Sequence, residues 1–249
     1  MTISWFHVVP LVVGLMFQAS KKPLPENLYP EWFLDAPSVS IFSVGYSDER
    51  SYVDSAIASA TREAAVNYIK SQHVRIAGEQ GMATFAVGKI PVGSTIKELY
   101  DENEAGRLGQ SMVAVDMFQR GRTVTVLAST DSAKKPQAVR RVDVSKVPKP
   151  PWVNQMPETN GYLYGTGLAP VYYYENNTWR EAERKARINM ALSVYAKVKS
   201  LTKKADDVYY REYQVEETNV AIQGLEIVSR WKDVKNQICY VLVRMPVGK

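Results

Sequence analysis

The same order of elements occurs twice along this 249-residue chain, and the repeat constrains the fold more than any other feature of the sequence. Each copy begins with a tryptophan two residues after a proline, Pro30 before Trp32 and Pro150 before Trp152, followed by a short apolar run that contains a glycine. Gly45 of the first run corresponds to Gly167 of the second. An alanine-rich stretch and two apolar runs around a polar turn complete each copy. This order predicts a strand, a helix and an antiparallel hairpin in each unit.

The expected strands cover residues 41–47 and 162–169, and the expected hairpins cover 113–127 and 225–243. In the hairpin turns, Gly121 and Asn236 are the residues that tolerate a positive φ at least cost. The alanines of the two helical stretches match at a constant offset of 126, which pairs Ala56, Ala60 and Ala65 with Ala182, Ala186 and Ala191. Alanines on one helix face allow a close approach to a sheet.

Two short motifs mark the expected helix starts. Thr178 followed by Glu181 forms a capping box, and Ser51 followed by Asp54 is its weaker counterpart. Such side chains accept or donate the hydrogen bonds that the first helical turn leaves unsatisfied. We therefore place the second helix start at Thr178 and the first at Ser51.

These elements predict an α+β fold of two tandem repeats, each a small antiparallel sheet packed against one long alanine-rich helix. The expected domains span 30–130 and 152–249. A sheet of about three strands leaves one face and both edges uncovered. We expect the second unit, or another subunit, to cover them.

The segment between the two units, residues 132–151, is basic and rich in proline. It holds six Lys or Arg residues and one Asp, a net charge of +5, which equals the net charge of the whole chain. The two units together are therefore near neutral, which does not favour a nucleic-acid partner. Either this linker is solvated, or it contacts acidic lipid head groups, a polyanion or an acidic partner. Residues 79–111, absent from the second copy, resemble a long glycine-containing loop.

Residues 1–19 contain no Lys, Arg, Asp or Glu, and their apolar run from Val8 to Phe17 ends shortly before Ala19. This pattern is typical of a secretory signal peptide, although the segment carries no positive side chain before the run. A cleaved signal and an uncleaved anchor are the two principal interpretations, and a cytosolic start is the third. We expect an exported protein of the periplasm or outer membrane.

The chain has two histidines and one cysteine, which excludes multi-cysteine zinc sites, paired-cysteine redox motifs and disulfide scaffolds. Cys239 lies in an apolar run and is expected to be a small buried hydrophobe. His73, at the end of the first helical stretch, is expected to cap that helix. Gly165 and Gly167 lack the third glycine of a dinucleotide fingerprint, so we interpret them as a site of close backbone packing. No phosphate loop, nucleophile elbow or zinc-protease motif occurs.

Tyrosines gather around the loop that precedes the second helix, where Tyr172, Tyr173 and Tyr174 are followed by Trp179. Such side chains bring large contact areas at low entropic cost and are enriched at interfaces. Either they pack the two small domains against each other, or they form a contact surface for a protein or a glycan. These four residues are the candidate partner-contact site, and no catalytic, cofactor-binding or metal-binding residues are expected.

The residues at 162–169, 182–192, 224–233 and 239–245 together resemble the Lpp-twenty family, typified by a twenty-kilodalton bacterial envelope lipoprotein and related to the flagellar assembly proteins FlgP and FlgT. The resemblance covers Trp152–Met245 well and Trp32–Ala128 more loosely. It implies an exported, non-enzymatic domain that assembles with itself or with larger envelope complexes. This chain differs from the family in carrying two copies and in lacking a lipid-accepting cysteine near its amino end.

Three hypotheses follow from the sequence. The first is an envelope scaffold or assembly protein that self-associates or docks on a larger envelope complex, such as a flagellar one, without a cofactor or nucleic acid. The second is a surface-binding module for cell-wall glycan, a membrane surface or a partner protein, which uses the tyrosine loop. The third is a hydrolase centred on His73, for which no other part of a nucleophile motif is present.

Overall fold

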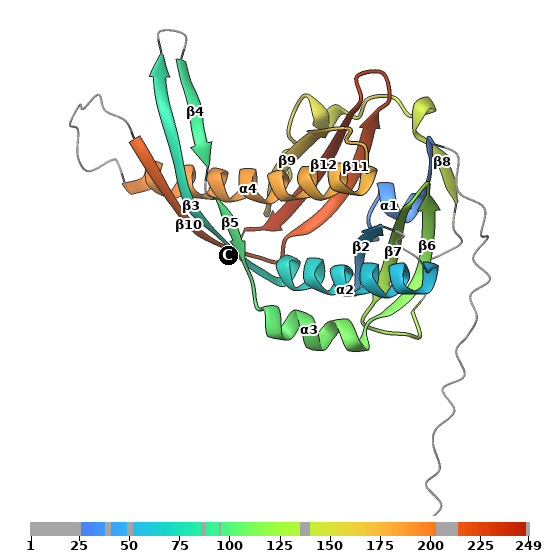
Figure 1. Cartoon of the computed structure of the whole chain (residues 1–249). Helices are drawn as coiled ribbons and strands as arrows, with labels where there is room; N and C mark the ends of the chain where they lie inside the picture. The colour runs from blue at the N-terminus through green and yellow to red at the C-terminus, as the bar shows by residue number, and fades with distance from the viewer. Residues whose placement is uncertain are drawn as a thin grey trace, which may run out of the picture.

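The computed structural model describes residues 26–37, 41–48, 52–85, 88–94, 96–134, 140–202 and 214–247. The chain forms a mixed α+β fold with several small antiparallel sheets and helices (Figure 1). The expected signal or anchor at 1–19 lies outside the described residues. Within them, no helix has the length and apolar content that crossing a bilayer requires.

The amino-terminal half contains a three-stranded sheet of β2 (Phe42–Asp48), β6 (Val113–Arg120) and β7 (Thr123–Ser129), in the order β2-β7-β6. Helix α2 (Val53–Gln72) packs on one face of this sheet. The predicted strand and hairpin are confirmed, and Gly121 in the hairpin turn has a φ of +54°.

The carboxyl-terminal half contains a sheet of β9 (Tyr162–Pro170), β11 (Glu226–Asp233) and β12 (Ile238–Pro246), in the order β11-β12-β9, with helix α4 (Glu175–Thr202) against it. The predicted hairpin is confirmed. The expected role of Asn236 is wrong, because the positive φ falls on the next residue, Gln237, at 54°. Asn236 is instead held by Asp233, which accepts hydrogen bonds from its amide N–H and its side chain.

A third sheet joins the two halves, and the sequence patterns did not predict it. After α2 the chain continues into β3 (His73–Phe85), which pairs antiparallel with β10 (Gln214–Gln223) from the other half. On the other side of β3 lie β4 (Gly88–Ser94) and β5 (Lys97–Leu99). In Figure 1, β3, β4 and β10 form an arm that projects from the body.

The prediction of a loop at 79–111 is therefore wrong. Most of the segment belongs to β3, β4, β5 and helix α3 (Glu102–Ser111). Asp101 caps the start of this helix, and its carboxylate accepts a hydrogen bond from the Glu104 amide at 2.8 Å. Glycines at 81, 88 and 93 suggested a loop, but Gly81 lies in β3, which pairs with the distant strand β10, and Gly88 and Gly93 lie in β4, which pairs with β3.

Part of the expected linker is built into the fold. β8 (Arg141–Asp143) pairs with β1 (Leu28–Pro30), and two 3-10 turns, η1 (Val144–Lys146) and η2 (Pro151–Val153), follow it. Short helix α1 (Glu31–Leu34) contacts β11 of the carboxyl-terminal half. The described part of this segment is thus bonded to the body, whereas the domain boundaries stay a prediction.

The expected capping box at Thr178 is wrong. Helix α4 begins three residues earlier, at Glu175, and the Thr178 hydroxyl accepts a hydrogen bond from the Tyr172 amide at 2.8 Å. Glu181 pairs with Arg184 on the same helix instead of reaching back to the helix start. The other expected cap, Ser51, lies outside the described residues.

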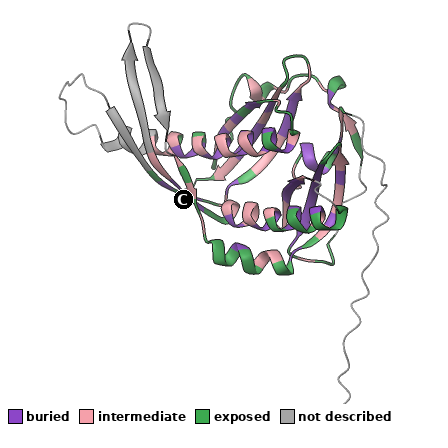
Figure 2. Ribbon diagram, in the orientation of Figure 1, coloured by how far each residue is buried: buried purple, intermediate pink, exposed green. Residues whose placement is uncertain are grey.

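One hydrophobic core serves both halves. It contains Tyr46 and Leu127 from the amino-terminal sheet, Phe33 from α1, and Trp179 and Val241 from the carboxyl-terminal half. A smaller cluster fills the space between α2 and its own sheet. Buried residues accordingly lie on the inner faces of α2, α4 and the sheets, whereas α3 is largely exposed (Figure 2). α1 and the carboxyl-terminal half therefore cover the face of the amino-terminal sheet that α2 leaves open, whereas the division into two tandem units stays a prediction.

Each helix approaches its edge strand through a glycine. A Cβ atom on Gly45 would overlap the Ala60 carbonyl oxygen and the Ala64 amide nitrogen, and one on Gly167 would overlap the same atoms of Ala182 and Ala186. The prediction of close backbone packing at Gly167 is confirmed. The predicted helix register is wrong, since corresponding residues of the two contacts lie 122 positions apart and not 126.

The same offset relates two asparagines that cover the strand edges. Asn67 of α2 donates a hydrogen bond to the Val44 carbonyl of β2, and Asn189 of α4 donates one to the Thr166 carbonyl of β9, both at 2.8 Å. Each amide occupies a carbonyl that an added strand would need. The small glycine contact therefore brings each helix close enough to cap the edge of its own sheet.

We predict that Gly45→Ala and Gly167→Ala each lower the free energy of unfolding by at least about 2 kcal/mol, because the new methyl group has no space against the helix backbone. Gly106→Ala in α3 is the matched control, since nothing lies within 4 Å of the position that its new methyl group would take. There the change should stabilise the protein by about 0.5–1 kcal/mol, the helix preference of alanine over glycine. Urea unfolding followed by circular dichroism measures all three, and a tolerated Gly45→Ala would contradict the close contact.

Candidate functional site

The predicted tyrosine surface is present in part. Tyr172, Tyr173 and Tyr174 are 43%, 91% and 36% exposed. The rings of Tyr173 and Tyr174 meet edge to face, with their centroids 4.9 Å apart. They occupy the end of the loop between β9 and α4. Of the two interpretations left open by the sequence, packing between the halves does not describe these three side chains, because they face solvent.

Trp179, the fourth predicted residue, does not belong to this surface. Its side chain is 2% exposed and packs edge to face against Phe33 and Tyr29 in the shared core. Because α4 begins at Glu175, Trp179 lies one turn inside the helix and faces inward. For this residue the contact between the two halves, and not a partner surface, is the correct interpretation.

The first helical turn of α4 carries a carboxylate that gathers groups from both halves. Glu175 accepts hydrogen bonds from Arg120 at 2.8 and 2.9 Å, from the Trp179 indole at 3.0 Å and from the Tyr29 hydroxyl. Lys232 of β11 lies 3.7 Å away. Burial raises the pKa of Glu175, and the Lys232 ammonium offsets part of that rise. Burial also lowers the pKa of Arg120 to about 10.

Two turns further along α4, Glu183 forms the most deeply buried ion pair of the described residues. Its Oε1 accepts hydrogen bonds from Arg230 at 2.8 and 3.0 Å and from the Tyr46 hydroxyl at 2.5 Å. Arg230 also donates to the Phe33 carbonyl at 2.7 Å. Burial holds the pKa of Tyr46 well above its ordinary value, so the phenol stays a donor. The pair connects β2, α1, α4 and β11.

The outer edge of β2 is closed by polar side chains of α4. Arg180 donates to the Tyr46 carbonyl at 2.9 Å and is held by Glu63 of α2 through bonds of 2.6 and 2.7 Å. Asn176 donates to the Ser47 carbonyl at 2.9 Å. Together with Asn67, these groups cover the edge carbonyls of β2, so this edge is not open to another strand.

A third buried carboxylate, Glu98 of β5, binds a cation from each helix. Arg187 of α4 contacts it at 2.5 Å and Lys70 of α2 at 2.7 Å. Burial alone would raise the pKa of Glu98, but the two cations hold it below its usual value. Its charged form is therefore favoured at neutral pH, and it draws α2 and α4 together near the base of the arm.

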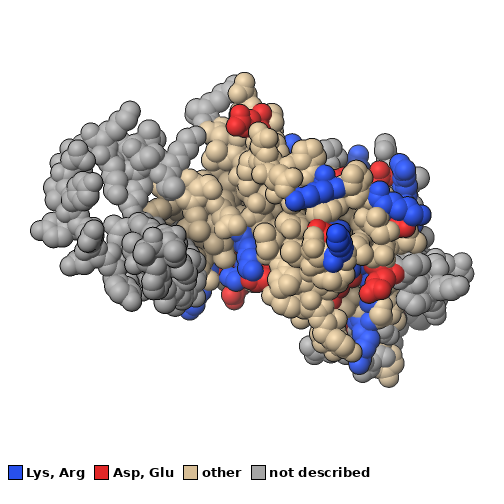
Figure 3. Space-filling model, turned by 90° about the horizontal axis from the view of Figure 1, so that it is seen from above, with Lys and Arg blue, Asp and Glu red and all other residues tan. Residues whose placement is uncertain are grey.

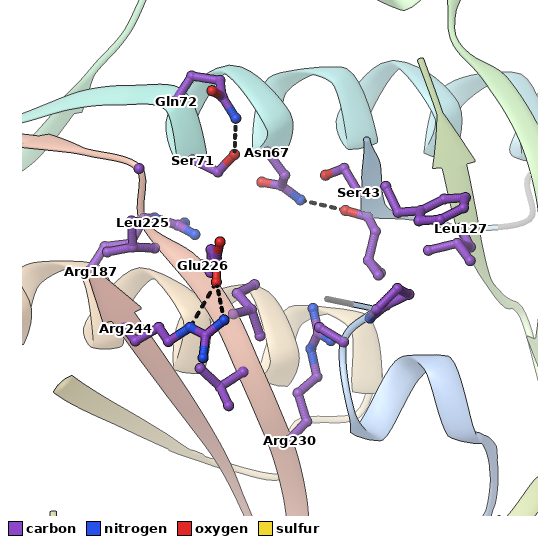
Figure 4. A pocket seen from close by; sticks show the side chains of 17 residues that line it. Ser43, Asn67, Ser71, Gln72, Leu127, Arg187, Leu225, Glu226, Arg230 and Arg244 are labelled. Atoms are coloured by element: carbon purple, nitrogen blue, oxygen red, sulfur yellow. Dashed lines mark hydrogen bonds and ion pairs between the residues drawn. The ribbon is translucent and has the colours of Figure 1, made fainter. Parts of the chain in front are cut away.

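Between these ion pairs lies a cavity of about 330 Å³. Its lining comes from the start of β2, the last turn of α2, the start of β11 and α4, so both halves contribute (Figure 4). Three arginines, Arg187, Arg230 and Arg244, face it from one half, and Ser43, Asn67 and Leu127 are among the residues from the other. This is the candidate binding cavity.

The remaining predicted residues occupy the expected positions. Cys239 is fully buried in β12, and burial raises the pKa of its thiol, which makes it a poor nucleophile. His73 is the carboxyl-terminal cap of α2 and is exposed, with its Nδ1 3.2 Å from the Gln223 side-chain amide. That neighbour is an amide from β10 and not a nucleophile.

Other described features do not define a chemical site. Among the described residues, no three His, Cys, Asp or Glu side chains come together as metal ligands would. On the face shown in Figure 3, basic and acidic side chains lie next to one another and form no patch of a single sign. Such a mixed surface does not have the character of a nucleic-acid groove.

The sequence patterns did not single out Glu175, Glu183 or Glu98. A carboxylate is normally solvated, and nothing in the local pattern distinguishes these three from less buried neighbours such as Glu181. A usable signal existed for Asn67 and Asn189, because each lies 22 residues after the glycine of its own unit.

Comparison of the chain with known protein families, with characterised proteins and with solved structures found no match in any of the three. The resemblance to the Lpp-twenty family therefore stays a prediction.

We predict that Glu183→Gln lowers the free energy of unfolding by about 3–5 kcal/mol, because it leaves the buried Arg230 charge without its counter-ion. Glu181→Gln, two residues away on the same helix, removes a partly exposed pair and should change stability by less than about 1 kcal/mol. Chemical denaturation of the two variants beside the wild type measures the difference. Equal losses would show that the buried Glu183–Arg230 pair contributes no more to stability than a surface pair does.

Proposed function

We propose that this chain is a non-enzymatic assembly protein of the bacterial cell envelope, exported by the segment 1–19, which associates with itself through the projecting arm. The observation that supports the proposal is that some strand edges are covered by side chains and others are not. The edges of β2 and β9 are capped by side chains, whereas one edge of the arm has no such cover among the described residues.

The arm has two outer edges, and they differ. β4 carries Pro91 in its middle, and proline has no N–H to donate to an added strand. β10 is ten residues long, contains neither proline nor glycine, and pairs only with β3 within the described part of the chain. Natural proteins seldom leave such a strand edge unprotected unless it is used. We therefore assign the contact to β10 and its partner to a second copy of this chain.

We also propose that the two halves are tandem copies of one unit, each a small antiparallel sheet packed against one long helix. Three observations support this: the sheets share one strand order, the glycine contacts recur at an offset of 122, and the asparagine caps recur at the same offset. In this scheme the two units of one chain already pack against each other, as two subunits of an assembly would. Assembly through the arm would extend the series.

The mass in solution of residues 20–249 tests self-association, with light scattering on a sizing column. We expect a defined oligomer, and we expect Asn219→Lys with Ala221→Lys, both exposed positions of β10, to return the protein to monomer by placing like charges along the edge. Val113→Lys on β6 is the control and should leave the oligomer intact. A wild-type monomer, or an oligomer that the β10 variant does not disturb, would refute the proposal. Recovery of the full chain in the cytosolic fraction would refute export.

A second candidate function, a surface that binds cell-wall glycan or a partner protein, is favoured by the exposure of Tyr172, Tyr173 and Tyr174. Exposed tyrosine rings can stack on sugar faces or on partner side chains. We expect Tyr172→Ser with Tyr173→Ser to abolish sedimentation with peptidoglycan, and Tyr52→Ser, an exposed tyrosine elsewhere, to have no effect. Unchanged sedimentation of the double variant would remove this candidate.

A further inference from the structure

The cavity between the halves is lined by both polar and apolar side chains (Figure 4). The polar ones include the three arginines, Asn67, and Ser71 and Gln72 at the end of α2. The apolar ones come from both halves: Phe42, Val44, Leu127, Leu225 and Ile227. Its volume of about 330 Å³ lies at the lower end of the range for small-molecule sites, which also occur preferentially between domains.

Arg187 is a buried cation of the cavity whose hydrogen-bonding capacity is used only in part. Its side chain is 6% exposed, and its Nε and Nη2 bind Glu98. Its Nη1 makes no hydrogen bond with the described residues, although the residue lines the cavity. A buried guanidinium that keeps an unused N–H group beside an open space favours an anionic acceptor in that space.

The charges around the cavity do not balance. Lys70 and Arg187 share the single carboxylate of Glu98, whereas Arg230 is neutralised by Glu183 and Arg244 by Glu226. Lys70 does not line the cavity, but it shares Glu98 with Arg187, so these four cations have three carboxylates among them and one positive charge is left beside the cavity. One negative charge in the cavity would complete the set, and a carboxylate supplies one charge at neutral pH whereas a phosphate monoester supplies nearly two.

We propose that this cavity binds a small amphipathic carboxylate, of the class of a medium-chain fatty acid. The carboxylate accepts hydrogen bonds from Arg187 near Asn67 and Gln72, and the aliphatic chain lies against Phe42, Leu127 and Ile227. The inference is independent of self-association, because the cavity is formed within one chain and none of its lining residues belongs to β10.

The test is isothermal titration of residues 20–249 with sodium decanoate below its micelle concentration. Decanol lacks the charge and butyrate lacks the chain, so both should bind at least roughly tenfold more weakly than decanoate. Absence of decanoate binding would overturn the proposal. Equal binding of decanol would show a purely apolar cavity, and equal binding of butyrate would show a simple anion site, and either result would overturn it too.

Two variants locate the binding. Arg187→Met removes the cation and should weaken decanoate binding by roughly tenfold or more. Because Arg187 also ties α4 to β5, Ser71→Phe is the second variant. The Ser71 hydroxyl bonds only within α2, where it donates to the Tyr68 carbonyl and accepts from the Gln72 side chain, and the larger ring fills the cavity. Arg184→Met, paired with Glu181 outside the cavity, is the matched control. Wild-type affinity in a folded Ser71→Phe protein would place the ligand elsewhere and refute the site.

Discussion

The Glu183 carboxylate lies inside the protein, and the arrangement of the two halves depends on what neutralises it. A buried carboxylate is tolerated only with a counter-ion and with hydrogen bonds to its oxygens. Arg230 of the carboxyl-terminal sheet and Tyr46 of the amino-terminal sheet supply them. Glu183 and Arg230 both belong to the carboxyl-terminal half, whereas Tyr46 belongs to the amino-terminal half, so separating the halves would break the Tyr46 hydrogen bond and expose the ion pair to water. On either side of it, Glu175 and Glu98 form ion pairs that cross between the halves, with Arg120 and Arg187, and separation would break both pairs.

Close helix packing makes these contacts reachable. Gly45 and Gly167 let the backbones of α2 and α4 approach strands β2 and β9 at a distance that no larger residue would allow. Only then do Asn67 and Asn189 reach the edge carbonyls. Each of these two sheets is thereby closed at one edge by its own helix. β10 has no such cover among the described residues, and it is the strand on which our functional proposal rests.

The sequence predicted elements well and their long-range partners poorly. Both hairpins and both glycine-containing strands follow from apolar patterns and turn residues, which are local signals. The prediction of the helix register failed because the true offset between the two copies, 122 residues, differs from the predicted 126 by four. A shift of four residues keeps alanines on the same helix face and so leaves the pattern almost unchanged. The pairing of β3 with β10 failed because neither strand carries a local signal of a partner so far away in the chain. The sequence did not identify the buried carboxylates because Glu183 can be buried only when it is paired with Arg230, which lies 47 residues away in the chain.

Hydrogen exchange in increasing urea tests the central claim that the two halves form one cooperative body. Strands β7 and β12 are the central strands of the two sheets, so their amides report on one half each. The account predicts that both sets of amides exchange through the same opening reaction, with equal free energies and equal dependence on urea. Distinct opening energies for β7 and β12 would show that each half unfolds alone, and would contradict the interlocked core.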